Sequence, residues 1–300
     1  MEFRQLESLV AVAESGSFSR AAVALNLTQP SLSRQISLLE QELGQRLLVR
    51  TGRGVAPSPA GEAFLVHARS LLEGSRRARD EMRDLDANPK GRVTVGMPPR
   101  VALGLSVPLI QSFRNRFPRA VVTVIEGLSL SLRESLVAGR LDMALMFDPL
   151  PSPQVAYEQL MRERLLLVGP RRSRMAATVS LTSLAALPMV MPNDPNSIRS
   201  LVNGVLIPRG ISLNVIAEVG AVQTVLALVL AGVGYTILPE SALLTSVEAK
   251  SLPRAPIGPP AIWNSLVLGV PLARPGSRLL RETAELLRKL DFREGLPAHT

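Results

Sequence analysis

Apolar residues recur at helical spacing through the first third of this chain, and in shorter runs separated by turns after it. In residues 1–15 the apolar positions lie three or four apart, which places them on one face of a helix. We expect this helix to turn the following side chains inward: Phe3, Leu6, Leu9, Val10 and Ala13.

Two further helices, with a short turn between them, are predicted over residues 17–43. Ser17 can cap the first and Thr28 the second, because both hydroxyls precede an apolar periodic segment. Asn26 and Leu27 supply the turn. The apolar positions of the second helix follow at spacings of four, three and four: Leu32, Ile36, Leu39 and Leu43. The opposite face is polar, so one side of this helix packs inward while the other is free to bind.

A long helix is predicted from Pro59 to about Asp86, because only Gly61 and Gly74 interrupt the helix-forming residues there. Its apolar and small positions alternate spacings of four and three, at residues 64, 68, 71, 75, 78, 82 and 85. Such a seam is typical of a helix that pairs with a second copy. We expect the dimer interface to contain Phe64, Ala68, Leu71, Ala78, Met82 and Leu85.

Turn-forming residues at 87–91 end this helix, and strands then alternate with helices. We expect strands at 92–97, 121–126, 141–147, 165–168, 189–191, 211–218, 234–238 and 265–270, and helices at 103–117, 130–138, 182–187, 196–204, 221–231 and 277–291. Alternation of this kind predicts parallel sheets with right-handed crossovers. The predicted fold class is therefore α/β overall, with two small α/β subdomains and a cleft between them in the second part of the chain.

Residues 17–61 carry the order of parts of a winged helix-turn-helix, because a basic segment with glycines at 52 and 54 follows the paired helices. At this point the chain resembles the N-terminal domain of LysR-type transcriptional regulators. The resemblance rests on these segments: Phe3, Leu6 to Ala13, Gly16 to Phe18, Ala21-Ala22, Thr28 to Ile36, Leu39-Glu40, Glu42 to Gly44, Arg50, Gly52 to Gly54 and Ala60-Gly61.

The second part of the chain resembles the effector domain of the same family, which is similar to a periplasmic binding protein. The matching patterns are Glu126 to Ser129 with Leu141 to Ala144, and Ala231 to Pro239. Residues 192–202 resemble the nitrogen-assimilation-control branch more than the aromatic-catabolism branch.

The resemblance implies three parts: a winged helix-turn-helix, mainly α, over residues 1–58, a linker and dimerisation helix over 59–88, and an effector-binding domain over 89–300. Within the last we place subdomain I at about 91–160 plus 266–292, and subdomain II at about 161–265. The implied partners are double-stranded operator or promoter DNA, a small-molecule effector, further copies of the chain in a homodimer and homotetramer, and RNA polymerase.

The free face of the second paired helix has the side chains that major-groove readout requires. Arg forks onto the O6 and N7 atoms of guanine, Gln pairs with adenine, and Ser suits either base or phosphate. We expect the DNA-binding residues to be Gln29, Pro30, Ser31, Ser33, Arg34, Ser37, Arg50, Thr51 and Arg53. Base contacts are assigned to Gln29, Ser31, Ser33 and Arg34, and contacts to phosphate or the minor groove to Arg50 and Arg53.

Ligands of open α/β folds bind beyond the carboxyl ends of the strands, where helix N-termini converge. The polar candidates at those points are Arg100, Ser129, Asn196, Ser197 and Arg199. We expect a small anionic metabolite to bridge Ser129 on one subdomain and Arg199 on the other, with Arg100 at the mouth. The alternative for Arg199 is a surface residue in a first helical turn.

The distribution of charge indicates the DNA-binding segment less clearly than the sequence motifs do. The net charge is +9, but residues 1–90 hold 12 Lys and Arg against 11 Asp and Glu. Residues 20–58 hold five Arg and two Glu, which is the local excess that matters for DNA.

Composition and missing motifs exclude several other functions. The chain has no cysteine and only two histidines, His67 and His299, so we expect no metal site and no cofactor. No phosphate-binding loop, nucleophile elbow or zinc-protease motif is present, so we expect no enzyme. A solute-binding protein or an enzyme of small acids is the alternative, and the fused helix-turn-helix and the lack of a signal peptide argue against it. The longest uncharged apolar run, Val225 to Leu238, is too short to span a bilayer, so we expect a cytoplasmic protein with no membrane partner.

Overall fold

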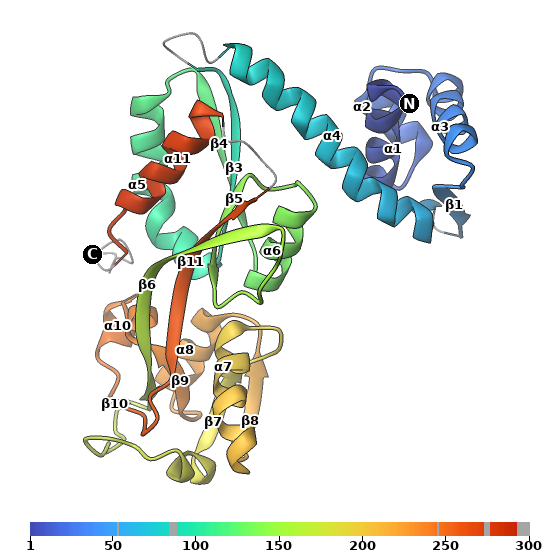
Figure 1. The fold of residues 1–300 in the computed structure, drawn as a ribbon. Coiled ribbons are helices and arrows are strands. Elements are labelled where there is room, and N and C mark those ends of the chain that lie inside the picture. Colours follow the sequence, from blue (N-terminus) through green and yellow to red (C-terminus); the bar gives the residue numbers. More distant parts are fainter. Residues whose placement is uncertain (53, 84–88, 245, 273–276, 293–300) are drawn as a thin grey trace. The chain divides into compact units, whose positions relative to one another are not determined.

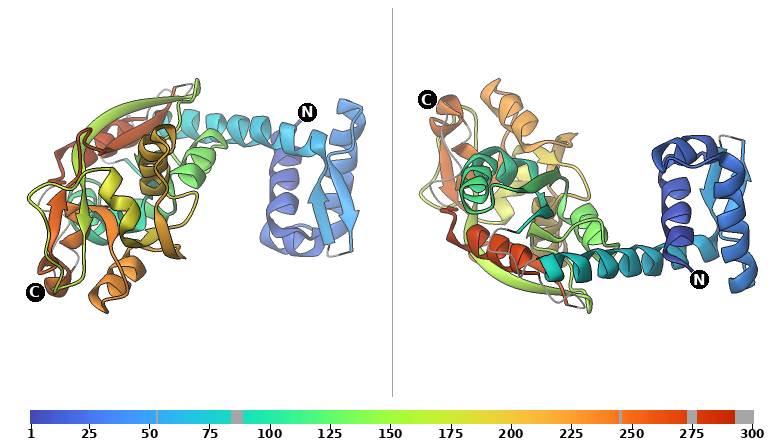
Figure 2. Two further views of the ribbon diagram at one scale, coloured as in Figure 1. Left: turned by 90° about the horizontal axis from the view of Figure 1, so that it is seen from below. Right: turned by 90° about the horizontal axis from the view of Figure 1, so that it is seen from above.

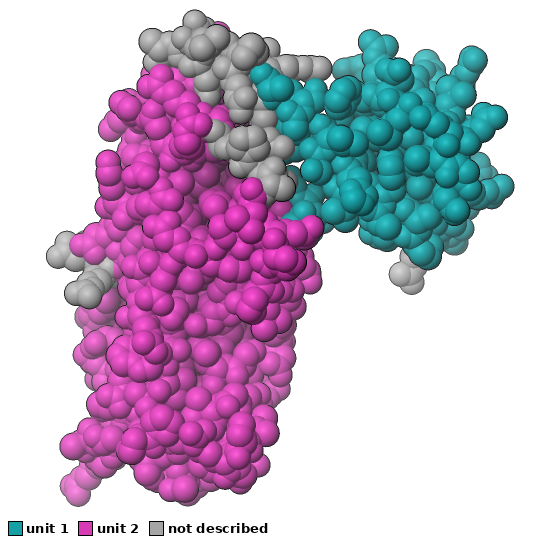
Figure 3. All heavy atoms as spheres, viewed as in Figure 1, with its two compact units in different colours: residues 1–87, 137–140 teal, residues 88–136, 141–300 magenta. Residues whose placement is uncertain are grey.

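The computed structural model describes residues 1–52, 54–83, 89–244, 246–272 and 277–292 (Figure 1). The chain divides into two compact units (Figure 3). Unit 1 comprises residues 1–87 and 137–140, and unit 2 comprises residues 88–136 and 141–300.

Unit 1 contains the predicted helices and a two-stranded wing, coloured from dark blue at its first helix to teal at the end of its last helix in Figure 2. Its elements are α1 (Phe3–Ser15), α2 (Phe18–Ala24), α3 (Gln29–Leu43), β1 (Leu48–Thr51), β2 (Gly54–Pro57) and α4 (Pro59–Arg83). The predicted caps are confirmed, since Ser17 Oγ accepts from the Arg20 N–H and Thr28 Oγ1 accepts from the Ser31 N–H, each at 3.4 Å. Asn26 has φ 53° in the turn between α2 and α3, a conformation that Asn adopts more readily than most residues.

The core of unit 1 lies between α1, α3 and the start of α4. Its fully enclosed side chains include Leu6, Leu9, Leu32, Leu39 and Leu65. Two residues predicted to face inward do not: Phe3 is 48% exposed and Leu43 is 36% exposed. Phe3 is the first residue of α1 and Leu43 the last of α3. The helical stripe therefore continues past the point where a neighbouring element covers it.

Gly61 fastens α4 to the wing. A Cβ at this position would lie 1.9 Å from the Leu47 carbonyl oxygen, so only glycine permits this approach. Ser58 completes the junction, because its hydroxyl accepts from the Gly61 N–H at 3.0 Å and donates to the Arg46 carbonyl at 2.5 Å. The Ala60-Gly61 pair of the sequence motif thus has a packing role.

Unit 2 is built on two sheets (Figure 1). The larger has the order β10-β6-β11-β5-β3-β4, with β9 also paired to β6, and the smaller is β7-β8. The strands are β3 (Gly91–Met97), β4 (Ala120–Glu126), β5 (Met143–Phe147), β6 (Val155–Val168), β7 (Pro188–Pro192), β8 (Asn214–Val219), β9 (Thr236–Pro239), β10 (Arg254–Pro256) and β11 (Trp263–Pro271).

The expectation of parallel sheets is correct for only part of unit 2. β3 pairs parallel with β4 and with β5, and β7 pairs parallel with β8. β6 instead pairs antiparallel with β9, β10 and β11, and β11 pairs antiparallel with β5. The sheet is mixed because β6 and β11 return through it in the opposite direction.

These two long strands join the halves of unit 2. The strand predicted at 165–168 is only the last part of β6, which begins at Val155. Its pairing with β11 runs from Val155 to Arg164, with a register shift at Leu266 and Val267. The subdomain boundaries placed at 160/161 and 265/266 therefore fall inside β6 and β11. Pro153 and Gly169 flank β6 in the sequence and could have indicated its limits. Its charged residues interrupt the alternation of apolar and polar positions that would have predicted the first part of the strand.

The predicted helices of unit 2 occur in the predicted order, and most bounds agree within a few residues, whereas two short helices, Glu240–Leu243 and Val247–Lys250, were not predicted. The helices are α5 (Pro99–Arg116), α6 (Ser129–Val137), α7 (Ser197–Leu206), α8 (Val222–Leu230), α9 (Glu240–Leu243), α10 (Val247–Lys250) and α11 (Arg278–Lys289), with 3-10 turns at Thr182–Ala186 and Ile207–Arg209. α5 begins four residues before the predicted start, because Pro99 occupies its first turn.

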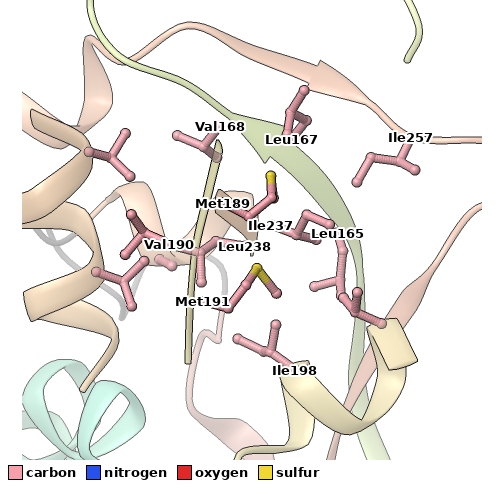
Figure 4. Close-up of a cluster of buried hydrophobic side chains, with 14 of the residues drawn as sticks. Leu165, Leu167, Val168, Met189, Val190, Met191, Ile198, Ile237, Leu238 and Ile257 are labelled. Carbon is pink, nitrogen blue, oxygen red and sulfur yellow. The ribbon is translucent and has the colours of Figure 1, made fainter. Parts of the chain in front are cut away.

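Each half of unit 2 has its own apolar core. One lies between the larger sheet, α5 and α11, and contains Val95, Leu109, Phe113 and Leu287. The other contains Leu165, Met189, Val190 and Ile237, from β6, β7 and β9 (Figure 4). Two cores joined by two strands place the loops between the halves where a ligand can contact both.

Candidate nucleic-acid interface and ligand cleft

The free face of α3 is polar and open to solvent. The exposed residues predicted to contact DNA are Gln29, Pro30, Ser31, Ser33, Arg34 and Ser37. Within the described chain Arg34 makes no ion pair, whereas the Gln29 Oε1 atom accepts from the Ser19 hydroxyl at 3.0 Å. The structure therefore brings the predicted α3 side chains together on one accessible surface.

A groove of about 390 Å³ runs between this face of α3 and the wing. Gln29, Ser33 and Ser37 of α3 line one side of the groove, and Arg46 and Arg50 line the side nearer the wing. Thr51 is also exposed, and its hydroxyl donates to the Gly54 carbonyl at 3.3 Å. Arg53 lies outside the described residues. Arg46 was counted in the basic excess of residues 20–58 but not among the predicted DNA-binding residues, although its place between α3 and β1 could have suggested it.

Glu40 holds the wing against α3. Its Oε1 atom accepts from the Leu47 N–H at 2.7 Å and from the Leu48 N–H at 3.1 Å. Both contacts join the recognition helix to the start of β1, so a carboxylate that lines the same groove as Ser33 and Ser37 fixes where the wing begins.

The second site is a cavity of about 110 Å³ in unit 2, called here the inner cavity. It lies beyond the carboxyl ends of β3, β5 and β8, as predicted for an open α/β fold. The residues that line it are Pro98, Pro99, Arg100, Leu128, Ser129, Phe147, Asn196, Ser197, Ile198, Gly220, Ala221, Val222 and Gln223. Four of the five predicted effector residues are among them.

Two polar side chains of the inner cavity keep a donor free, one from each half of unit 2. Ser129 Oγ accepts from the Phe147 N–H at 2.9 Å, and its hydroxyl donates to no acceptor within the described chain. Asn196 is 8% exposed, and its Oδ1 atom caps α7 by accepting from the Ile198 N–H at 3.0 Å. Its Nδ2 group has no acceptor among the described residues. Both groups can therefore donate to a ligand.

Arg100 lies inside the cavity wall rather than at the mouth, which corrects the prediction. It is 6% exposed, and its Nη1 and Nη2 atoms each lie 3.3 Å from Glu163 Oε1. Nη1 also donates to the Ser241 hydroxyl, and the guanidinium carbon lies 4.5 Å from the centre of the Phe147 ring. Burial lowers the pKa of Arg100, while the Glu163 carboxylate opposes this shift. The Arg100 guanidinium points into the protein because it pairs there with the Glu163 carboxylate of β6.

Arg199 does not line the cavity, which corrects the predicted bridge to Ser129. Its Nη2 atom lies 2.9 Å from Glu218 Oε1 on β8. Arg199 is the third residue of α7, so it projects from a different side of the helix than Ser197, the first residue. The alternative for Arg199, a surface residue in a first helical turn, is correct for the helical turn but wrong for the exposure, since the side chain is only 15% exposed.

A larger outer cavity of about 450 Å³ shares Ser129, Phe147 and Ser197 with the inner one. It adds two charged residues, Arg133 and Asp148. Burial raises the pKa of Asp148, whereas hydrogen bonds from the Ser265 N–H and the Asn264 amide oppose this. Asp148 is thereby committed to the β11 backbone rather than to a ligand.

The predicted dimer seam of α4 is only partly available. Ala68 is fully buried in the core of unit 1 beside Leu9 and Leu65, so it cannot contact a second copy. Phe64 is half-buried against the same core, whereas Leu71 and Ala78 are exposed. The Met82 side chain and Leu85 lie outside the described residues. Because the first turns of α4 pack on their own domain, Phe64 and Ala68 are not available for a contact with a second copy.

Both sequence regions match bacterial regulator families. Residues 3–62 match the family described as bacterial regulatory helix-turn-helix protein, lysR family, and residues 86–291 match the LysR substrate binding domain. This chain belongs to the LysR family. It is a DNA-binding transcriptional regulator with an effector-binding domain, and not an enzyme.

Full-length relatives place this LysR-family regulator in the nitrogen-assimilation-control branch, as residues 192–202 predict. It is 33% identical to the nitrogen assimilation regulatory protein nac of Klebsiella aerogenes over 297 residues, which are 99% of this chain and 97% of that protein. It is also 33% identical to the protein of that name from Escherichia coli K12, over 96% of this chain and 94% of that protein.

Solved structures of full-length regulators share the fold. A full-length OxyR variant from Pseudomonas aeruginosa matches with a TM-score of 0.74 and 22% identity, over 96% of this chain and 93% of that one. CbnR, a LysR family transcriptional regulator, matches with a TM-score of 0.63 and 25% identity, over 96% and 99%. CbnR in complex with its target DNA matches with a TM-score of 0.53 and 27% identity, over the same shares of the two chains.

The described part of this LysR-family chain offers neither a membrane span nor a metal cluster. No described helix is both long and apolar enough to cross a membrane. No three His, Cys, Asp or Glu side chains among the described residues gather where they could hold a metal ion.

Proposed function

We propose that this regulator reads its operator through α3 and the wing, and that a small anionic metabolite in the inner cavity controls it. The observation that carries the control is the pair of free donors, the Ser129 hydroxyl and the Asn196 amide, which face one cavity from opposite halves of unit 2. An anion that accepts from both joins the halves, so it has a different affinity for different angles between them.

Operator reading is assigned to the exposed face of α3. Arg34 forks onto a guanine, while Gln29, Ser31 and Ser33 contact other base edges or phosphate. Pro30, Ser37 and Thr51 lie on the same surface and shape the contact. Arg50 binds phosphate or the minor groove, which supplies affinity without sequence preference, and the same role is proposed for Arg53 from the sequence.

The effector acts through the two strands that join the halves. β6 and β11 are continuous across both, so a change of angle between the halves must bend or twist these strands. We infer that this change alters how paired DNA-binding domains are held, and thereby DNA bending and contact with RNA polymerase.

The helix α4 is proposed to pair two copies. With Ala68 enclosed in its own domain, the contact begins at Leu71, 43% exposed, and continues through Ala78 one heptad later. In the sequence, Met82 and Leu85 continue the same heptad register. Phe64 packs on its own domain and precedes the start of this contact.

An apolar stripe on unit 2 supports a second pairing that gives a tetramer. On α5 the side chains of Leu103, Val107 and Ile110 are 48%, 60% and 37% exposed, and they lie on one face. On the neighbouring edge strand β4, Val121 and Ile125 are 51% and 44% exposed. An apolar patch of this kind on a water-exposed edge is best covered by a second copy.

A single aspartate substitution in each interface tests the two pairings independently. We expect Leu71→Asp to break the α4 pairing and Val107→Asp to break the α5 pairing, because each places a carboxylate in an apolar contact. Sedimentation equilibrium should show a smaller assembly for each variant, and Ser70→Asp, about 100° around α4 from Leu71, should match wild type. Unchanged mass for Leu71→Asp would contradict the α4 interface.

We retain the domain division of 1–58, 59–88 and 89–300, with a bipartite effector domain whose halves meet within β6 and β11. A regulator that binds chromosomal DNA in a bacterium acts in the cytoplasm, which is the location we propose.

The test of this function is titration of the full-length protein against DNA from upstream of its own gene, at fixed salt, with a scrambled competitor. Tight binding that survives the competitor is the expected result. Binding that the competitor abolishes on every upstream fragment, with and without added metabolites, contradicts operator recognition.

A further inference from the structure

The charge of the inner cavity is balanced within the protein. Of the described residues that line it, Arg100 alone carries a full charge. Glu163, behind Arg100 on β6, contacts both terminal nitrogens of the guanidinium with one carboxylate oxygen. The pair is well shielded from water, with side chains 6% and 12% exposed. A ligand therefore meets a guanidinium whose charge is already matched.

The donors that remain suit one negatively charged group. Ser129 offers its hydroxyl and Asn196 its amide, and the helices α6, α7 and α8 begin at the cavity with their N–H groups. Helix N-termini and neutral donors favour an anion, but each carries only a partial charge. They hold one carboxylate, and the described lining residues include no unmatched cation for a second one.

The rest of the lining is apolar and narrow. Pro98, Leu128, Ile198 and Val222 form much of it, and the Phe147 ring covers one face of the Arg100 guanidinium. The volume of about 110 Å³ is smaller than the ~150 Å³ cavity that holds a benzene molecule. The outer cavity adjoins this space at Ser129, Phe147 and Ser197, so the volume limits the part of the ligand beside the Ser129 and Asn196 donors, which must be short and aliphatic.

We propose that the inner cavity selects a short aliphatic monocarboxylate, and that Glu163 sets this selectivity by neutralising Arg100. The carboxylate accepts from Ser129 and Asn196, and the aliphatic end lies against Ile198 and Val222. A dicarboxylate is rejected because its second charge finds no unmatched cation, and an aromatic acid because of its size. The proposal rests on the proposed function in that it names the effector class of the same cavity.

Four small probes test this on the full-length protein by calorimetry: propionate, its neutral analogue propionamide, the dicarboxylate malonate, and benzoate. We expect propionate to bind at least tenfold more tightly than each of the other three. Equal or tighter binding of any other probe overturns the proposal, and so does a lack of propionate binding. Tighter malonate binding would indicate that Arg133 in the outer cavity takes the second carboxylate.

The variant Glu163→Gln tests the role of the buried carboxylate. Gln keeps the size and an acceptor for Arg100 but removes the negative charge, so malonate should bind at least tenfold more tightly than it does to wild type. Unchanged malonate affinity overturns the role of Glu163. Glu158→Gln, an exposed carboxylate on the same strand that pairs with Arg288, is the matched control and should leave all affinities unchanged.

Two more measurements keep the outcomes distinct. Ser129→Ala should lose propionate binding, which tests the carboxylate position even if Glu163→Gln fails to fold. Operator affinity is then measured with and without saturating propionate. Propionate that binds but leaves operator affinity unchanged contradicts effector control while the ligand class stands.

Discussion

Two arginines of this regulator, Arg34 in the DNA-binding unit and Arg100 in the effector-binding unit, were both predicted to meet a ligand, and their surroundings differ in kind. Arg34 is exposed on α3 and makes no ion pair among the described residues. Arg100 is buried, ion-paired to Glu163 and covered by Phe147. A polyanion such as DNA brings its own charge and needs accessible cations. A small ligand enters a preformed cavity, where an unpaired cation would cost more free energy than the fold can offset.

The largest expected effect tests the buried arginine. Arg100→Ala should lower the free energy of unfolding of unit 2 by about 3–5 kcal/mol, because it leaves the Glu163 carboxylate buried without its partner. Urea unfolding followed by the fluorescence of Trp263, the single tryptophan, reports on this unit.

Two comparisons sharpen that result. The double variant Arg100→Ala with Glu163→Gln should recover part of the loss, since no unpaired carboxylate remains. Arg116→Ala removes a surface partner of Glu282, with the arginine side chain 57% exposed, and should change stability by less than about 1 kcal/mol. Equal losses for Arg100→Ala and Arg116→Ala would remove the contrast between buried and exposed pairs.

The next effect concerns the exposed arginines. Arg34→Ala should weaken operator binding by about 1–3 kcal/mol and relax the preference at one base pair. Arg50→Ala should weaken binding to all sequences alike and reduce the salt slope by about one. Titrations of operator and scrambled DNA at several salt concentrations distinguish the two. Unchanged affinity and preference in Arg34→Ala would exclude it from base readout.

The smallest effect tests how the wing is held. Glu40→Gln should destabilise unit 1 by about 1 kcal/mol, because the two bonds from the Leu47 and Leu48 N–H groups lose a charged acceptor. Thermal unfolding followed by far-ultraviolet circular dichroism measures the loss. Glu42→Gln, on the same helix and paired with the N-terminal amine, is the control and should have the stability of wild type.

The sequence alone determined the features that depend on nearby residues. Helical spacing located α1 to α4, and Ser17 and Thr28 located two helix starts, because caps and stripes are set by residues within a few positions. The DNA-reading face followed, since the residues opposite a buried stripe must be exposed. The alternation of strands and helices located the cavity at the strand ends, where four of five predicted residues lie.

Only the tertiary structure decided which charges meet. Arg100 pairs with Glu163, 63 residues away, and contacts Ser241, 141 residues away, and no local pattern encodes either contact. Glu163 stands in the charged run Arg162 to Arg164, where spacing does not tell which side chain turns inward. The same reason explains why Ala68 is enclosed by its own domain and why Arg199 forms an ion pair with Glu218. Periodicity gives the face of an element, whereas the partner on that face is set by the packing of distant segments.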